Sequence, residues 1–218
     1  MIKQLNTILI VASLLFWRPL YAQGLKEDLI SVYKKFSDAS FKMEVEMHTV
    51  YRNSAQQPTM QKGLVKKQGN NYYTEFGGQI QLTNKHYSLL LLEKEKTIVY
   101  APLEEHSTEA SSNQISKMMA DTGLFNDNVT LVKTTAQMKE YEVQLNQSGM
   151  EKMRIQLTSQ NTLKQVIYYY EKTTSNPIKE VRIAYKNIVF NPSFSLAEFS
   201  EQRYFKKVDK KEVLQGKY

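Results

Sequence analysis

The residues that most often carry chemistry are few in this chain, and they do not fall at the spacings that chemistry needs. It has three histidines, His48, His86 and His106, and no cysteine. No two histidines stand at a spacing typical of a metal site, and the acidic run Glu104-Glu105 beside His106 reads as a solvated loop. Nucleotide-binding, nucleophile-elbow and metalloprotease motifs are missing, and no pair of carboxylates stands out. We therefore expect no catalytic residue, no metal and no cofactor, and a protein that is not an enzyme.

Aromatic and methionine residues are more informative. The 14 tyrosines and 9 phenylalanines could stack on nucleic-acid bases, but most fall in segments with strand character, where tyrosine is a good sheet former. Met43, Met47 and Met153 fall on the apolar sides of predicted strands, and Met118 and Met119 on or beside a predicted helix. Methionine suits cavities that take variable apolar guests, and it also fills gaps in ordinary cores. Both interpretations remain open at this point.

The first 22 residues have the pattern of a secretory signal peptide. Lys3 is followed by an apolar run over residues 8–16, then by Pro19 and by a small residue, Ala22, at a suitable cleavage point. The apolar run is too short for a stable transmembrane helix. We expect cleavage after Ala22, a soluble product and a periplasmic or otherwise secreted location, which excludes nucleic acid as a partner.

Composition is that of an ordinary globular chain. The 218 residues include 29 Lys and Arg against 22 Asp and Glu, for a net charge of +7. The length suits one domain, predicted over residues 23–218. Basic residues are spread evenly except between Arg203 and Lys217, where a solvated tail is favoured over contact with an acidic partner. The missing cysteine excludes disulfides and a lipid-modified N-terminal cysteine.

The periodicity of apolar residues predicts a fold dominated by strands. An amphipathic helix is expected over residues 24–39, and a second short helix over about 115–125. Alternating or apolar segments predict strands over 41–51, 60–67, 72–76, 79–82, 87–93, 97–101, 129–132, 141–145, 153–157, 163–170 and 178–190. Residues 203–208 could add an edge strand. The predicted fold class is mainly β (α+β): a curled antiparallel sheet forming a half-open barrel, covered by the N-terminal helix and the inserted helix. Two small helices over so wide a sheet should leave an apolar hollow.

Three stretches of the sequence resemble the periplasmic outer-membrane lipoprotein carriers, the LolA/LolB-like family. They are the long alternating strand after the first helix (Phe41–Tyr51, FKMEVEMHTVY), a strand with a glycine before basic residues (Lys62–Lys67, KGLVKK), and a strand that ends in an aromatic residue before a turn (Thr97–Pro102, TIVYAP). The resemblance extends from Gly24 to about Tyr204, and it implies a divergent member of that family.

The resemblance implies a soluble periplasmic carrier that holds the acyl chains of lipids or lipoproteins in an apolar concavity. The implied lining residues are Phe41, Met43, Val45, Met47, Tyr141, Val143, Leu145, Met153, Ile155 and Leu157. The implied lid residues are Met118, Met119, Leu124 and Phe125. The implied partners of this monomer are a lipid or lipidated protein, an inner-membrane donor and an outer-membrane acceptor. The alternative is a non-catalytic protein-interaction or sensor module of the cell envelope on the same fold, and an enzyme acting on envelope material ranks third.

Overall fold

A computed structural model of the chain describes residues 18–53, 55–102, 128–147, 149–173, 176–208 and 211–214. The strands of the described part are β1 (Phe41–Tyr51), β2 (Thr59–Gln68), β3 (Asn71–Phe76), β4 (Gln79–Thr83), β5 (Tyr87–Leu92), β6 (Thr97–Pro102), β7 (Val129–Thr134), β8 (Met138–Gln147), β9 (Met150–Thr158), β10 (Leu163–Tyr170), β11 (Ile178–Phe190), β12 (Phe205–Val208) and β13 (Lys211–Leu214). The described helices are α2 (Arg18–Asp38) and the short 3-10 helices η3 (Leu196–Phe199) and η4 (Glu201–Arg203).

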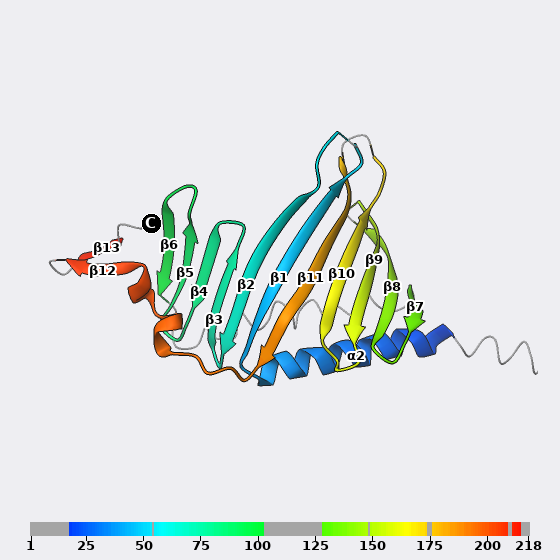
Figure 1. Cartoon of the computed structure of the whole chain (residues 1–218), viewed down its shortest axis with the longest axis horizontal. Helices are drawn as coiled ribbons and strands as arrows, with labels where there is room; N and C mark the ends of the chain where they lie inside the picture. Colours follow the sequence, from blue (N-terminus) through cyan, green and yellow to red (C-terminus); the bar gives the residue numbers. More distant parts are fainter. Residues whose placement is uncertain are drawn as a thin grey trace, which may run out of the picture. The chain divides into compact units, whose positions relative to one another are not determined.

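Eleven of the described strands form one sheet in the order β6-β5-β4-β3-β2-β1-β11-β10-β9-β8-β7 (Figure 1). Successive strands from β2 to β6 and from β7 to β10 pair antiparallel. β11 is inserted between β1 and β10, and β6 and β7 are the two outer strands, so the sheet is open. The predicted fold class is therefore confirmed: a mainly β chain with an open antiparallel sheet and an N-terminal helix.

Two elements differ from the expectations. Helix α2 begins at Arg18 rather than near residue 24, and Pro19 is compatible with this start because proline is tolerated in the first turn of a helix. β12, expected at the edge of the sheet, instead pairs with β13 in a separate two-stranded sheet. The predicted inserted helix lies outside the described residues.

The chain divides into two compact units. The first unit comprises Met1–Lys34, Thr49–Pro58 and Ser116–Arg182, and the second comprises Lys35–His48, Thr59–Ile115 and Ile183–Tyr218. The first therefore holds most of α2 with strands β7–β10. The second holds strands β2–β6, most of β1 and β11, and the C-terminal elements.

In the first unit, α2 packs on one face of β7–β10. The pairing places Tyr141 opposite Ile155 and Val143 opposite Met153, so these four side chains share a face. All four are at most 9% exposed. The helix contributes Leu25 and other apolar side chains, and Leu25 is completely buried. Because the side-chain period of a strand is two, the residues in between form a separate polar face.

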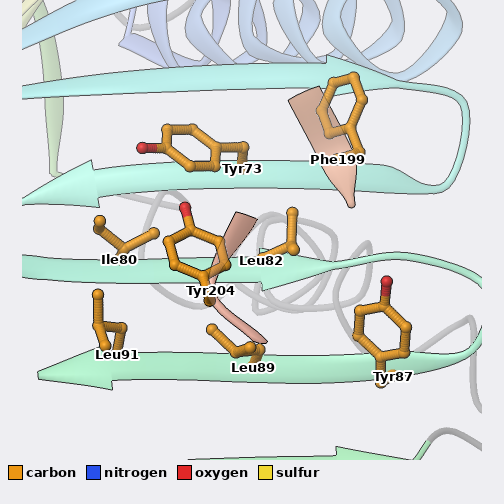
Figure 2. Packing of buried hydrophobic residues seen from close by; sticks show 8 residues of the cluster. All are labelled: Tyr73, Ile80, Leu82, Tyr87, Leu89, Leu91, Phe199 and Tyr204. Atoms are coloured by element: carbon orange, nitrogen blue, oxygen red, sulfur yellow. The ribbon is translucent and has the colours of Figure 1, made fainter. Parts of the chain in front are cut away.

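In the second unit, the chain after β11 returns across strands β3–β5. We call residues 194–204 the C-terminal strap. Its aromatic side chains Phe199 and Tyr204 are 3% and 1% exposed, and they belong to one buried cluster with six residues of the strands. Those six are Tyr73, Ile80, Leu82, Tyr87, Leu89 and Leu91. Figure 2 shows Tyr204 lying over the strands among Ile80, Leu82 and Leu89.

The directions of two consecutive lysine side chains of β2 show that the helix end and the strap cover opposite faces of the second unit. Lys66 forms an ion pair with the strap residue Glu198, with Nζ and Oε2 2.7 Å apart. The next residue, Lys67, points to the other face and donates from Nζ to the carbonyl oxygens of Phe36, Ser37 and Ala39 at the end of α2. Consecutive strand residues face opposite sides. We therefore call the two faces the strap side and the helix side.

Candidate acyl-chain site

Six of the ten predicted lining residues lie in the first unit, on the face that α2 covers. Their exposed fractions range from 0% for Val143 to 9% for Met153. The six are Tyr141, Val143, Leu145, Met153, Ile155 and Leu157. They form the core between helix and strands in this unit, so an acyl chain could reach them only if α2 moved away from the strands.

Polar contacts hold α2 on this face. The carboxylate of Asp28 accepts hydrogen bonds from the Tyr141 hydroxyl at 2.7 Å and from Lys139 Nζ at 2.8 and 2.9 Å. Further along the helix, Ser31 Oγ accepts a hydrogen bond from the Asn161 amide at 3.1 Å. Burial, and then the hydrogen bond to Asp28, raise the pKa of Tyr141. The phenol is therefore neutral at physiological pH and remains a donor to the helix.

Replacing Tyr141 with phenylalanine tests how firmly the helix is held. Tyr141→Phe keeps the buried ring and removes the hydroxyl that donates to Asp28. We expect the free energy of unfolding to fall by about 1.5–3 kcal/mol, the range for a hydrogen bond to a charged group. Urea denaturation followed by far-UV circular dichroism measures it. Gln144→Leu in the same strand is the control, since the exposed Gln144 amide donates to Glu142 on the face away from α2. Equal stability of Tyr141→Phe and wild type would show that the hydrogen bond from Tyr141 to Asp28 does not hold the helix in place.

The other four predicted lining residues follow β1 in the second unit, on its helix side. Phe41 is buried and its ring packs edge-on against Phe36 of α2, with centroids 4.9 Å apart. Met43, Val45 and Met47 continue along the strand beyond the helix end and are only half-buried. They are therefore a partly open apolar stripe rather than a closed core.

The opposite face of β1 is polar and tied to its neighbours. Glu46 Oε2 lies 2.5 Å from Lys186 Nζ of β11, and Glu46 Oε1 lies 3.8 Å from Lys62 Nζ of β2. Glu44 accepts a hydrogen bond from the Asn187 amide at 2.8 Å. The ion pairs with Lys186 and Lys62 hold the pKa of Glu46 below its usual range, although burial acts in the opposite direction. The apolar stripe of β1 thus lies on the side away from these charges.

Further apolar side chains lie on the helix side of the second unit, and they are not among the residues predicted to line the site. Residues that pair across neighbouring strands lie on the same face. Val65 pairs with Thr74, and Leu90 pairs with Gln81 on one side and with Val99 on the other, and these residues lie on the helix side. Leu90 and Leu92 are half-buried, whereas their neighbours Leu89 and Leu91 are buried beneath the strap on the other face. A strand with apolar side chains on both faces is typical of a sheet that is covered on both sides, so the helix face of β5 is suited to contact with another apolar group. The unbroken run Leu89–Leu92 was the available signal in the sequence.

The four predicted lid residues, Met118, Met119, Leu124 and Phe125, lie outside the described residues. Across the part of the chain that is described, three or more His, Asp and Glu side chains do not gather where they could hold a metal ion. Within the same part, no helix is both long and apolar enough to cross a membrane.

Comparison with known proteins gives a match in structure but not in sequence. No family model and no curated protein matches this chain. Among solved structures, an uncharacterized conserved protein from Thermus thermophilus is 9% identical, with 81% of this chain and 92% of that chain covered and a TM-score of 0.48. LprF from Mycobacterium bovis is 11% identical, with 78% and 94% covered and a TM-score of 0.40. A LolA superfamily protein from Nitrosomonas europaea is 11% identical, with 84% and 99% covered and a TM-score of 0.36. The family that the sequence resembles is thus among the solved structures to which this chain is similar.

Proposed function

We propose that this protein is a non-catalytic carrier that binds acyl chains of lipids or lipidated proteins on the helix side of its second unit. The observation that carries the proposal is the half-buried stripe Met43, Val45 and Met47, which extends beyond the end of α2. Each methylene of an acyl chain that leaves water there contributes roughly 0.8 kcal/mol. Flexible methionine side chains let such a site adapt to chains of different length.

The site's surroundings fit a soluble carrier. On the opposite face of the second unit, the strap covers strands β3–β5 with its own aromatic side chains, so the apolar stripe of β1 on the helix side is the better candidate for an acyl chain. In a periplasmic location the carrier would work without ATP, and binding would depend on burial of the chain alone. The proposed partners are a donor at the inner membrane and an acceptor at the outer membrane.

A charge placed in the stripe tests this proposal. Val45→Glu should weaken binding of cis-parinaric acid and of a palmitoylated peptide at least tenfold, because a carboxylate buried against an acyl chain costs several kcal/mol. Fluorescence titration measures the affinity, and native mass spectrometry of the purified protein should detect copurifying lipid. Val189→Glu is the matched control, because Val189 is 50% exposed. Circular dichroism verifies that both variants fold.

Two results would overturn the carrier function: a wild-type protein that binds neither probe, or a folded Val45→Glu variant that binds both as tightly as wild type.

One observation favours the second candidate, an envelope protein-interaction module. The outer strand β6 exposes Val99 and Tyr100 by 53% and 45%, one on each face. An outer strand with exposed apolar side chains is a common docking edge for another chain. If the acyl probes fail to bind while the protein associates with an envelope protein and Val99→Lys abolishes that association, this second function replaces the first.

A further inference from the structure

A pocket of about 770 Å³ lies in the second unit, where the C-terminal strap crosses the ends of the strand hairpins. Asn71 at the start of β3 and residues 84–87 around the β4–β5 turn form one side of it. Strap residues 199–203 form the other. Its volume falls within the range of small-molecule sites, about 300–1,000 Å³.

Hydrogen bonds fix the two sides of the pocket to each other. The Asn84 amide nitrogen donates to the Phe199 carbonyl at 3.2 Å, and Asn84 Oδ1 accepts from the backbone N–H groups of His86 and Tyr87 at 2.8 and 3.2 Å. The Tyr87 hydroxyl donates to the Glu201 carboxylate and accepts from the Glu201 backbone N–H at 3.1 Å. Burial, followed by the bond to Glu201, raises the pKa of Tyr87 to about 12. The pocket is therefore preformed.

Basic side chains outnumber acidic ones among the lining residues. The basic lining residues are Lys85, His86 and Arg203. Among the described residues of the wall, the acidic one is Glu201. The Glu201 carboxylate already accepts from Tyr87 and, at 3.2 Å, from the Ser200 hydroxyl. Burial acts against it, but these hydrogen bonds lower the pKa of Glu201, which is therefore ionised and engaged. The positive charge of Lys85 and Arg203 remains in excess.

The guanidinium of Arg203 is oriented by aromatic rings. Its central carbon lies 5.8 Å from the ring centroid of Tyr73 and 6.0 Å from that of Tyr204, both within the range of cation–π attraction. The nearby Glu198 is paired with Lys66 at 2.7 Å. The planar, always charged guanidinium matches two oxygens of a phosphate at once, which a lysine does not.

We propose that this pocket binds a phosphate-bearing anion, with Arg203 and Lys85 contacting the phosphate oxygens and Asn71 donating from its amide. The ligand is either a free phosphoester or the headgroup of a phospholipid. This site is distinct from the acyl-chain site and does not depend on it. Because Lys85, His86 and Arg203 are exposed, the affinity should fall severalfold between about 50 and about 300 mM salt, where charges are increasingly screened.

Titration of the wild-type protein with inorganic phosphate, sn-glycerol 3-phosphate and dihexanoyl phosphatidylglycerol, followed by NMR and calorimetry, tests the site. At least one probe should bind and shift the backbone signals of Lys85 and Arg203. The double variant Lys85→Gln/Arg203→Gln should bind it at least tenfold more weakly. The double variant Lys94→Gln/Lys172→Gln removes the same charge at exposed positions outside the pocket and should stay within twofold of wild type.

The outcomes separate the two sources of phosphate and the two sites. Equal affinity for glycerol 3-phosphate and the short-chain lipid identifies a free phosphoester, and a tenfold preference for the lipid identifies a headgroup. Val45→Glu should leave glycerol 3-phosphate binding unchanged, so failure of the acyl-chain site does not imitate failure of this one. Absence of binding by all three probes, or equal loss in both double variants, would overturn the phosphate site.

Discussion

Tyr204→Ala is expected to lower the free energy of unfolding by about 3–5 kcal/mol, the range for removing a large aromatic side chain from a core. Tyr204 is 1% exposed and is among the largest fully buried side chains of the described residues. Its ring covers Ile80, Leu82 and Leu89 on strands that would otherwise expose them to water (Figure 2). Urea denaturation followed by the near-UV circular dichroism of tyrosine measures the loss.

Tyr204→Phe is the matched control, since it keeps the ring and should cost no more than about 1.5 kcal/mol, the value of a typical hydrogen bond. Phe199→Ala should resemble Tyr204→Ala, because both side chains belong to the same buried cluster. The double variant should cost less than the sum of the two, since either change releases the strap. A loss below about 1 kcal/mol for Tyr204→Ala, close to the scale of a surface substitution, would show that the strap is not part of the core.

Lys67→Met is expected to have the second largest effect, a loss of about 2–4 kcal/mol, because it leaves three part-buried backbone carbonyl contacts at the end of α2 without their donor. Lys67 is 6% exposed. Its ammonium lies at the last turn of α2 and donates to the carbonyls of Phe36 and Ala39 at 3.1 and 3.3 Å, and to that of Ser37. A cation at this end of a helix is also favoured by the helix dipole. Urea denaturation gives the stability, and amide hydrogen exchange of residues 33–38 should report faster opening of the helix end.

Lys62→Met in the same strand is the control for this variant. The Lys62 side chain is 67% exposed and its nearest acid, Glu46, is 3.8 Å away, so its removal should change stability by less than about 0.5 kcal/mol. Were Lys67→Met as stable as Lys62→Met, with hydrogen exchange at the helix end unaltered, the contact with the carbonyls would not hold the helix to β2.

Strand positions were predictable because alternation of apolar and polar residues is a local property of the chain. The pattern from Phe41 to Tyr51 predicted β1 with its correct bounds, and the same reasoning located β10 and β11. The start of α2 was placed too late, because Arg18 and Pro19 were interpreted as the end of a signal peptide. A local apolar pattern cannot distinguish these two uses of one segment.

The candidate site was predictable only in part. Alternation correctly placed Met43, Val45 and Met47 on one face of β1, and whether they bind an acyl chain stays a prediction. The contribution of Leu90 and Leu92 was missed, since a continuous apolar run does not show which residues face which side. The pocket beneath the strap could not be predicted from the sequence either, because the lining residues Lys85 and Arg203 are separated by more than a hundred residues and come to the same pocket through the path of the strap.

By itself, the sequence determined the mainly β class, the presence of an N-terminal helix and the two sides of alternating strands such as β1, because these depend on periods of two and 3.6 residues along the chain. Tertiary structure decided what covers each side. Phe199 and Tyr204 pack against strands more than a hundred residues away, and Lys67 reaches the carbonyls of a helix that ends almost thirty residues earlier. Such contacts depend on how the strands are ordered in the sheet, and no local spacing encodes that order.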